Sequence, residues 1–110
     1  MINTSNFAKS KRYPKDCLIS IARWQPKGAN LRSYPDLFPD EGTLRRYKIN
    51  GDEKQFEKEY RQKLAGLHPA QVAGDLDGKI LLCYEKSDAF CHRHIVRSWL
   101  NANGFPCEEI

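Results

Sequence analysis

The sequence predicts an α/β fold: a small, mostly parallel, three-layer (Rossmann-like) sandwich of about three to four strands. Two short apolar segments, Cys17–Ala22 and Lys79–Glu85, have the composition of buried strands. Segments of helical periodicity lie between them, and parallel strands need such helical crossovers. The segment Phe105–Ile110 adds a third strand, which we expect at the edge of the sheet.

The chain is expected to form one domain, 17–110, preceded by a basic amino-terminal arm, 1–16. The arm is polar and carries four cations around Tyr13 and Pro14: Lys9, Lys11, Arg12 and Lys15. It can be a solvated segment packed across the domain, or a basic segment that reaches a phosphate backbone. It can also supply a further strand.

Arg23 and Trp24 follow the first strand directly. In a parallel sheet they emerge at the same edge as the end of Lys79–Glu85. Trp24 can stack on a base or ring, or it can cover the edge of the core. The connection Gln25–Pro39 is long and rich in proline, which is typical of a lid or a binding segment.

Helices are expected between the two apolar strands. Asp40 is a candidate N-cap of a short helix that ends at Asn50-Gly51. Asp52, with Gln55 three residues later, predicts the start of a longer helix. The buried stripe of this longer helix comprises Phe56, Tyr60, Leu64 and Leu67. His68-Pro69 begins a short connecting helix, since proline is tolerated at the first helical position.

The corner formed by Lys79–Glu85 and the segment after it is the expected functional site. A polar loop, Lys86–Asp88, follows the strand. A helix then opens with Cys91-His92-Arg93-His94 and ends before Gly104; its apolar residues are Ile95, Val96, Trp99 and Leu100. In α/β proteins, ligands bind where strands end and helices begin.

Alternation in the strand places Leu81, Cys83 and Glu85 on one face, with Glu85 at the carboxyl end. Free backbone N–H groups at a helix start favour an anion and can lower the pKa of a cysteine there. The candidate catalytic residues are therefore Glu85, Cys91 and His92, and the candidate anion-binding residues are Arg23, Trp24 and Arg93. The structural alternatives stay open: Cys83 as a small core residue, Glu85 as a solvated strand end, and the Cys-His-Arg run as a structural element.

The four cysteines predict free thiols rather than a disulfide framework or a metal site. No Cys-x-x-Cys pair exists, and the neighbours Cys91 and His92 are expected to project in different directions. We therefore expect no disulfide, no metal shared by Cys83 and Cys91, and no cofactor. No signal peptide or membrane span is recognisable, so a cytoplasmic, reducing location without membrane contact is expected.

The net charge of +4, from 18 basic and 14 acidic residues, is compatible with nucleotide or nucleic-acid partners. No Gly-x-Gly-x-x-Gly or Walker motif occurs, which disfavours ordinary dinucleotide binding and nucleoside-triphosphate hydrolysis. A small phosphate-bearing molecule is the expected partner, with nucleic acid as the alternative. The sequence does not name the oligomeric state.

The run Leu81-Leu82-Cys83-Tyr84-Glu85, followed by Phe90-Cys91-His92-Arg93-His94-Ile95-Val96 and Trp99-Leu100, resembles the signature of the bacterial and phage family DUF488. That signature is a Cys-x-Glu strand end followed by Cys-His-Arg. Weaker matches are Ile19–Arg23, Tyr47-Lys48 and the spaced Phe56, Tyr60 and Leu64, so the resemblance covers most of 17–100. Family members often carry Asp-Val-Arg where this chain has Ile-Ala-Arg, so an acidic role there is missing. The resemblance implies the site and no particular activity.

Two functions follow from these residues. The first is an enzyme, of the hydrolase or transferase type, acting on a nucleotide-like or other phosphate-bearing substrate at the carboxyl edge of the sheet. Arg23 and Arg93 would hold the anion, Glu85 would act as base or nucleophile, and Cys91 or His92 would assist. The second is a non-catalytic phage-type or regulatory module that binds nucleic acid or a host protein through the basic edge.

Overall fold

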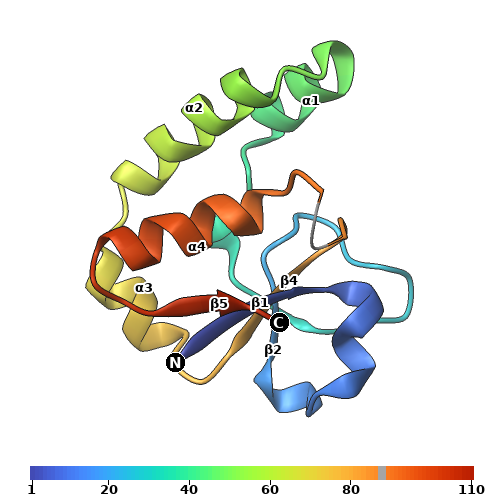
Figure 1. Cartoon of the computed structure of the whole chain (residues 1–110). Helices are drawn as coiled ribbons and strands as arrows, with labels where there is room; N and C mark the ends of the chain where they lie inside the picture. The colour runs from blue at the N-terminus through green and yellow to red at the C-terminus, as the bar shows by residue number, and fades with distance from the viewer. Residues whose placement is uncertain (87–88) are drawn as a thin grey trace.

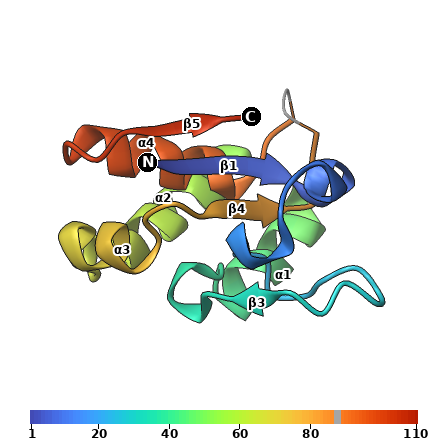
Figure 2. The same ribbon diagram turned by 90° about the horizontal axis from the view of Figure 1, so that it is seen from below.

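Five parallel strands form the centre of the computed structural model, which describes residues 1–86 and 89–110 (Figure 1). Their order across the sheet is β3-β2-β4-β1-β5, and Figure 2 shows β5, β1, β4 and β3 in this succession. The strands are β1 Ile2–Asn6, β2 Leu18–Ser20, β3 Arg32–Ser33, β4 Ile80–Cys83 and β5 Cys107–Glu109. The α/β prediction is confirmed, with more strands than expected. Ser87 and Asp88 of the predicted polar loop lie outside the described residues.

The helices begin and end close to the predicted capping residues. They are α1 Glu41–Asn50, α2 Glu53–Ala65, α3 Pro69–Asp75 and α4 His92–Ala102, with 3-10 turns η1 Phe7–Arg12, η2 Lys15–Cys17 and η3 Pro35–Leu37. Asp52 caps α2 by accepting a hydrogen bond from the Gln55 amide at 3.1 Å. Asp40 occupies the N-cap position of α1, but its carboxylate accepts from Lys63 Nζ at 3.2 Å instead of capping the helix.

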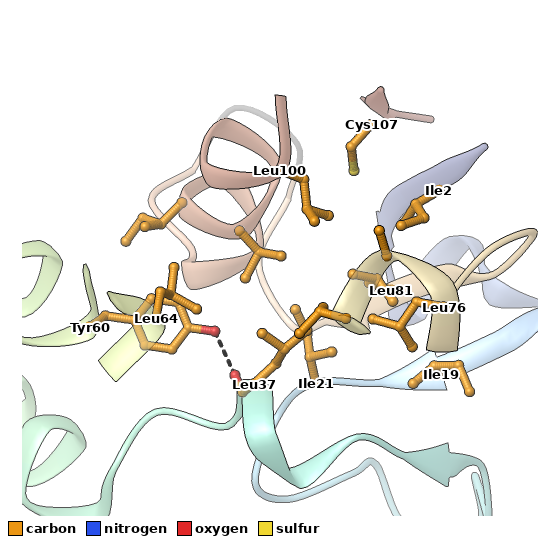
Figure 3. Packing of buried hydrophobic residues seen from close by; sticks show 14 of the residues in the cluster. Ile2, Ile19, Ile21, Leu37, Tyr60, Leu64, Leu76, Leu81, Leu100 and Cys107 are labelled. Carbon is orange, nitrogen blue, oxygen red and sulfur yellow. Dashed lines mark hydrogen bonds between the residues drawn. The ribbon is translucent and has the colours of Figure 1, made fainter. Parts of the chain in front are cut away.

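The two faces of the sheet have separate hydrophobic layers. Leu81 faces a large cluster that includes residues of α2, α3 and α4 (Figure 3). Ile80 and Leu82 face the opposite side and pack with Phe7 and Tyr13. Strand alternation therefore works as predicted, and it directs Leu81 and Cys83 toward the helices.

The segment 1–16, expected to form a basic arm, contributes β1 and the turns η1 and η2. β1 pairs with β4 on one side and β5 on the other, so it is an inner strand and the predicted boundary at residue 16 does not separate an arm from the domain. Its buried polar side chains are satisfied: Thr4 Oγ1 donates to Glu109 at 2.6 Å, and Ser5 Oγ donates to the Ile110 carbonyl at 3.0 Å. Burial of polar residues is thus possible because the neighbouring chain accepts their hydrogen bonds.

The connection 25–39, expected to be a long loop, is partly ordered by pairing. β3 within it lies parallel to β2, with Ile19 beside Arg32. Gln25 stabilises this connection, because its side-chain amide donates to the Leu31 carbonyl at 2.7 Å and accepts from the Leu31 amide at 2.8 Å. No helix among the described residues is both long and apolar enough to cross a membrane.

Candidate functional site

The carboxyl ends of β2 and β4 meet at one edge of the sheet, next to the start of α4. The two strands are parallel, with Ser20 beside Leu82, which confirms the predicted pairing. A pocket of about 360 Å³ lies at this edge. It is lined by Ala22, Arg23, Trp24, Pro39, Leu44, Lys48, Cys83, Tyr84, Glu85, Cys91 and His92.

The pocket brings together five of the six residues predicted for the site: Arg23, Trp24, Glu85, Cys91 and His92. Lys48, on α1, and Cys83, at the end of β4, also line it although neither was among the predicted site residues. The sequence feature that points to Lys48 is its place in the Tyr47-Lys48 match to the family pattern. The feature that points to Cys83 is strand alternation, which puts Cys83 on the same face as Glu85.

The rim of the pocket is cationic and aromatic. Arg23 is held by the Pro39 carbonyl, which accepts from Nε at 3.3 Å and Nη2 at 3.1 Å. Its Nη1 lies 3.5 Å from a carboxylate oxygen of Glu41. The Lys48 ammonium lies 5.8 Å from the ring centroid of Trp24, and this ring is 59% exposed. An exposed indole beside a lysine ammonium, in a pocket that Arg23 also lines, is suited to a planar, negatively charged ligand.

Glu85 is exposed, two residues beyond the end of β4. Its neighbour Tyr84 packs against Phe7 with ring centroids 4.9 Å apart. The Glu85 charge also reaches Tyr47: burial raises the pKa of the Tyr47 phenol, and the charges of Glu53 and Glu85 add to this rise. A carboxylate in this position is accessible to a ligand in the pocket and can act as a general base.

Cys83 and Cys91 are joined by a disulfide, with sulfurs 1.98 Å apart. The expectation that no disulfide would join any cysteines was therefore wrong; Cys17 and Cys107 are free. The pairing arises because Cys83 ends β4 and Cys91 is the N-cap of α4, so both belong to the same corner. The sequence separation of 8 residues gave no Cys-x-x-Cys signal.

His92 is buried and has a defined tautomer. Its Nε2 lies 2.7 Å from the Ile21 carbonyl oxygen, and a carbonyl can only accept, so Nε2 carries the proton. Nδ1 is then an acceptor, 3.8 Å from Cys91 Sγ. Burial lowers the pKa of His92 to about 4, although the bond to Ile21 opposes this shift, so the ring is neutral at pH 7.

The predicted divergence of Cys91 and His92 was also wrong. Their ligand atoms and that of Cys83 all lie within 4.8 Å of one another, and all three residues are buried. The extended backbone of Cys91, with φ −155° and ψ 147°, precedes the helical backbone of His92. This change of conformation brings the two side chains together, whereas helical geometry alone would separate them.

Arg93 lies outside the pocket lining and does not meet the expectation of an anion-binding residue. Its side chain is fully buried, and Glu109 accepts from Nε at 3.1 Å and from Nη2 at 2.9 Å. Nη1 donates to Cys83 Sγ at 3.0 Å. The negative partner of Arg93 is therefore a residue of β5 rather than a bound anion.

Two comparisons with known proteins gave no match: no curated protein and no solved structure matches the chain. A family model does match. Its description is "Active DUF488-N3 subclade", and the match covers residues 2–104. It therefore includes every element that forms the pocket.

Proposed function

We propose a function from the premise that the chain belongs to the DUF488 family: it is an enzyme that acts on a nucleotide-like or other phosphate-bearing substrate in the pocket at the carboxyl edge of the sheet. The observation that carries the proposal is the convergence in this pocket of Arg23, Lys48, Trp24 and Glu85 above Cys91 and His92. The description of the matched subclade as active favours an enzyme over a binding module.

The size and the rim of the pocket support the choice of substrate. A volume of about 360 Å³ falls within the range of roughly 300–1,000 Å³ common for small-molecule sites. Arg23 lines the pocket and is held in place by Pro39, so it would lose little side-chain freedom on binding. Lys48 supplies a second cation, and Trp24 supplies a flat apolar surface for a base.

Glu85 is the proposed base or nucleophile. As a base it would take the proton of an attacking water or hydroxyl, whose oxygen bonds to the reacting carbon or phosphorus of the substrate. The glycosidic or phosphoester bond breaks at the same time, and the leaving group departs into solvent and takes a proton from water. This role is available whether Cys83 and Cys91 are oxidised or reduced, because Glu85 has no part in the disulfide. While Cys83 and Cys91 are joined as the disulfide, His92, neutral and anchored by Ile21, would assist as a proton acceptor at Nδ1.

Ligand-induced thermal stabilisation tests this proposal. The protein is screened against nucleosides, nucleoside mono-, di- and triphosphates and dinucleotides. We expect the phosphorylated compounds to raise the melting temperature, and a ligand at 100 times its Kd to add about 2.7 kcal/mol to the free energy of unfolding.

Lys48→Gln should reduce the response to the phosphorylated ligands, and Lys58→Gln is the matched control because Lys58 is exposed on α2 and does not line the pocket. A protein that no phosphorylated compound stabilises, or an equal loss in both variants, would contradict the proposal.

A nucleic-acid-binding or host-protein-binding module is the second candidate. The observation that favours it is the cationic composition of η1 and η2, which carry Lys9, Lys11, Arg12 and Lys15. A binder of this kind should bind single- or double-stranded oligonucleotides with an affinity that falls steeply with salt. Lys11→Gln with Arg12→Gln should then weaken binding, while Lys48→Gln should have little effect.

A further inference from the structure

We infer that Cys83, Cys91 and His92 bind one Zn²⁺ ion when the two cysteines are reduced. The three side chains form a buried group whose ligand atoms lie within 4.8 Å of one another. Two thiolates and one imidazole are ligands that Zn²⁺ prefers. The binding of the metal is independent of the proposed substrate, whereas the catalytic use of the ion described below rests on the proposed function.

The spacing of Cys91 and His92 suits a tetrahedral ion. Cys91 Sγ lies 3.8 Å from His92 Nδ1. Zn–S and Zn–N bonds of about 2.3 and 2.0 Å at a tetrahedral angle place sulfur and nitrogen about 3.5 Å apart. The Cα atoms of Cys83 and Cys91 are 7.4 Å apart, beyond the roughly 4.4–6.8 Å usual between disulfide-bonded cysteines. Two thiolates that share a metal ion span this separation.

The groups around the ligands also favour a metal. The Ile21 carbonyl accepts from His92 Nε2 at 2.7 Å, which leaves the Nδ1 lone pair for the ion; zinc-bound histidines almost always have such a partner on the other nitrogen. Arg93 Nη1 donates to Cys83 Sγ at 3.0 Å. A guanidinium N–H bonds more strongly to a thiolate than to a neutral sulfur, so this contact favours the reduced, anionic form.

The charges of the buried site balance when the ion is bound. Two thiolates neutralise Zn²⁺, and Arg93 is neutralised by Glu109 at 2.9 Å. Without the ion, two thiolates would add buried negative charge that Arg93, already paired with Glu109, does not neutralise, and such uncompensated charge is unfavourable. The ion therefore completes an arrangement that the surrounding residues already provide.

The three protein ligands leave one position of a tetrahedral ion open, as in catalytic zinc sites. All three line the pocket that also contains Glu85. A water molecule in the open position would have a lowered pKa and could lose its proton to the Glu85 carboxylate. The site is thus placed to supply the attacking hydroxide of a hydrolytic reaction.

The conversion of the disulfide form into the zinc form balances in electrons and protons. Two thiol molecules, such as glutathione, give two electrons and two protons to the Cys83–Cys91 bond and leave as their own disulfide. Zn²⁺ then replaces the two thiol protons, which are released to solvent. A two-electron oxidant such as peroxide reverses the change and expels the ion.

Elemental analysis provides the first test. The protein is reduced with excess dithiol without oxygen, loaded with zinc chloride and freed of unbound metal. We expect one zinc ion per chain in the wild type and a loss of at least tenfold in retained zinc in Cys83→Ser, Cys91→Ser and His92→Gln. Cys17→Ser is the matched control and should retain the ion, because Cys17 lies outside the pocket. Zinc retained by the Cys83→Ser and Cys91→Ser variants, or absent from the fully reduced wild type, would overturn the inference.

A second measurement avoids variants that fail to fold. The reduced wild type is alkylated with and without zinc, and each cysteine is quantified by mass spectrometry. We expect zinc to slow the labelling of Cys83 and Cys91 at least tenfold while Cys17 is labelled at the same rate. Equal labelling of Cys83 and Cys91 in both samples would refute the site. Neither measurement contains a nucleotide, so failure here is distinguishable from failure of the proposed function.

Discussion

Arg93 and Glu109 form a buried ion pair that joins the first turn of α4 to β5, with Nη2 and Oε2 2.9 Å apart. The guanidinium is fully buried, and the carboxylate is 15% exposed. Thr4 Oγ1 donates to the same carboxylate at 2.6 Å, so β1 also takes part in the contact.

Arg93→Gln should destabilise the protein strongly, since removing one partner leaves a buried charge uncompensated. We expect a loss of about 3–5 kcal/mol in the free energy of unfolding, measured by urea denaturation. Arg61→Gln is the control: its pair with Glu57 on α2 is exposed on both sides, and such pairs contribute about 0–1 kcal/mol. A small effect of Arg93→Gln would show that the pair is not structural.

Glu85→Gln should abolish turnover of any substrate that the nucleotide screen reveals, while leaving ligand-induced stabilisation in place. Because Glu85 is exposed, the free energy of unfolding should change by less than about 0.5 kcal/mol. Product formation and thermal shift are measured on the same preparation, with Glu108→Gln on β5 as the exposed control. Retained turnover would remove Glu85 from the catalytic role.

Cys107 predicts a loss of stability at alkaline pH. Burial raises the pKa of its thiol to about 11, from an ordinary value of 9.0; Arg97 opposes this shift, and Glu109 and Glu108 add to it. The unfolded chain therefore loses the proton first. The contribution of the protonated Cys107 thiol to the free energy of unfolding is fully present below about pH 9, and it is lost as the pH rises toward about 11.

Urea unfolding at about pH 8 and about pH 10.5 should show a smaller loss in Cys107→Ala than in the wild type. Burial raises the pKa of Tyr60 as well, but this contribution is common to both proteins and cancels in their difference. Equal losses in the two proteins would rule out Cys107 as a source of the alkaline sensitivity.

Two glycines should respond to alanine in opposite directions. Gly104 follows α4 with φ +85°, so Gly104→Ala should cost about 1–2 kcal/mol, because a Cβ is disfavoured in this conformation. Gly74 lies in α3, and a Cβ there would meet no atom within 4 Å. Gly74→Ala should stabilise by up to about 1 kcal/mol. Thermal unfolding measures both; shifts of the same sign would contradict this assignment.

The strand and the helix of the site were predictable because their apolar residues follow regular patterns. The continuous apolar run 80–83 indicates a buried strand, and the spacing of Ile95, Val96 and Leu100 indicates a helix. β1 was not predictable in this way, because Ile2 is its one hydrophobic residue. The buried hydroxyls of Thr4 and Ser5 donate to residues 109 and 110, at the other end of the sequence. A partner so distant in the chain leaves no local signal.

The burial of Arg93 follows from the helical spacing of the sequence. Val96 and Leu100 stand three and seven residues after it, so all three share the buried face of α4. Its partner Glu109 could not be inferred, because it depends on how β5 joins the sheet. The pairing of Cys83 with Cys91 depends in the same way on the path of the intervening loop.

The inner position of β1 has a consequence for synthesis on the ribosome. Asn3 lies beside Ile80 on one side and Glu108 on the other. A nascent chain therefore carries Ile2–Asn6 without either neighbouring strand until β4 has left the exit tunnel. Pairing of such distant segments is slow. The middle of the sheet consequently cannot close until β4 and β5 have both been synthesised.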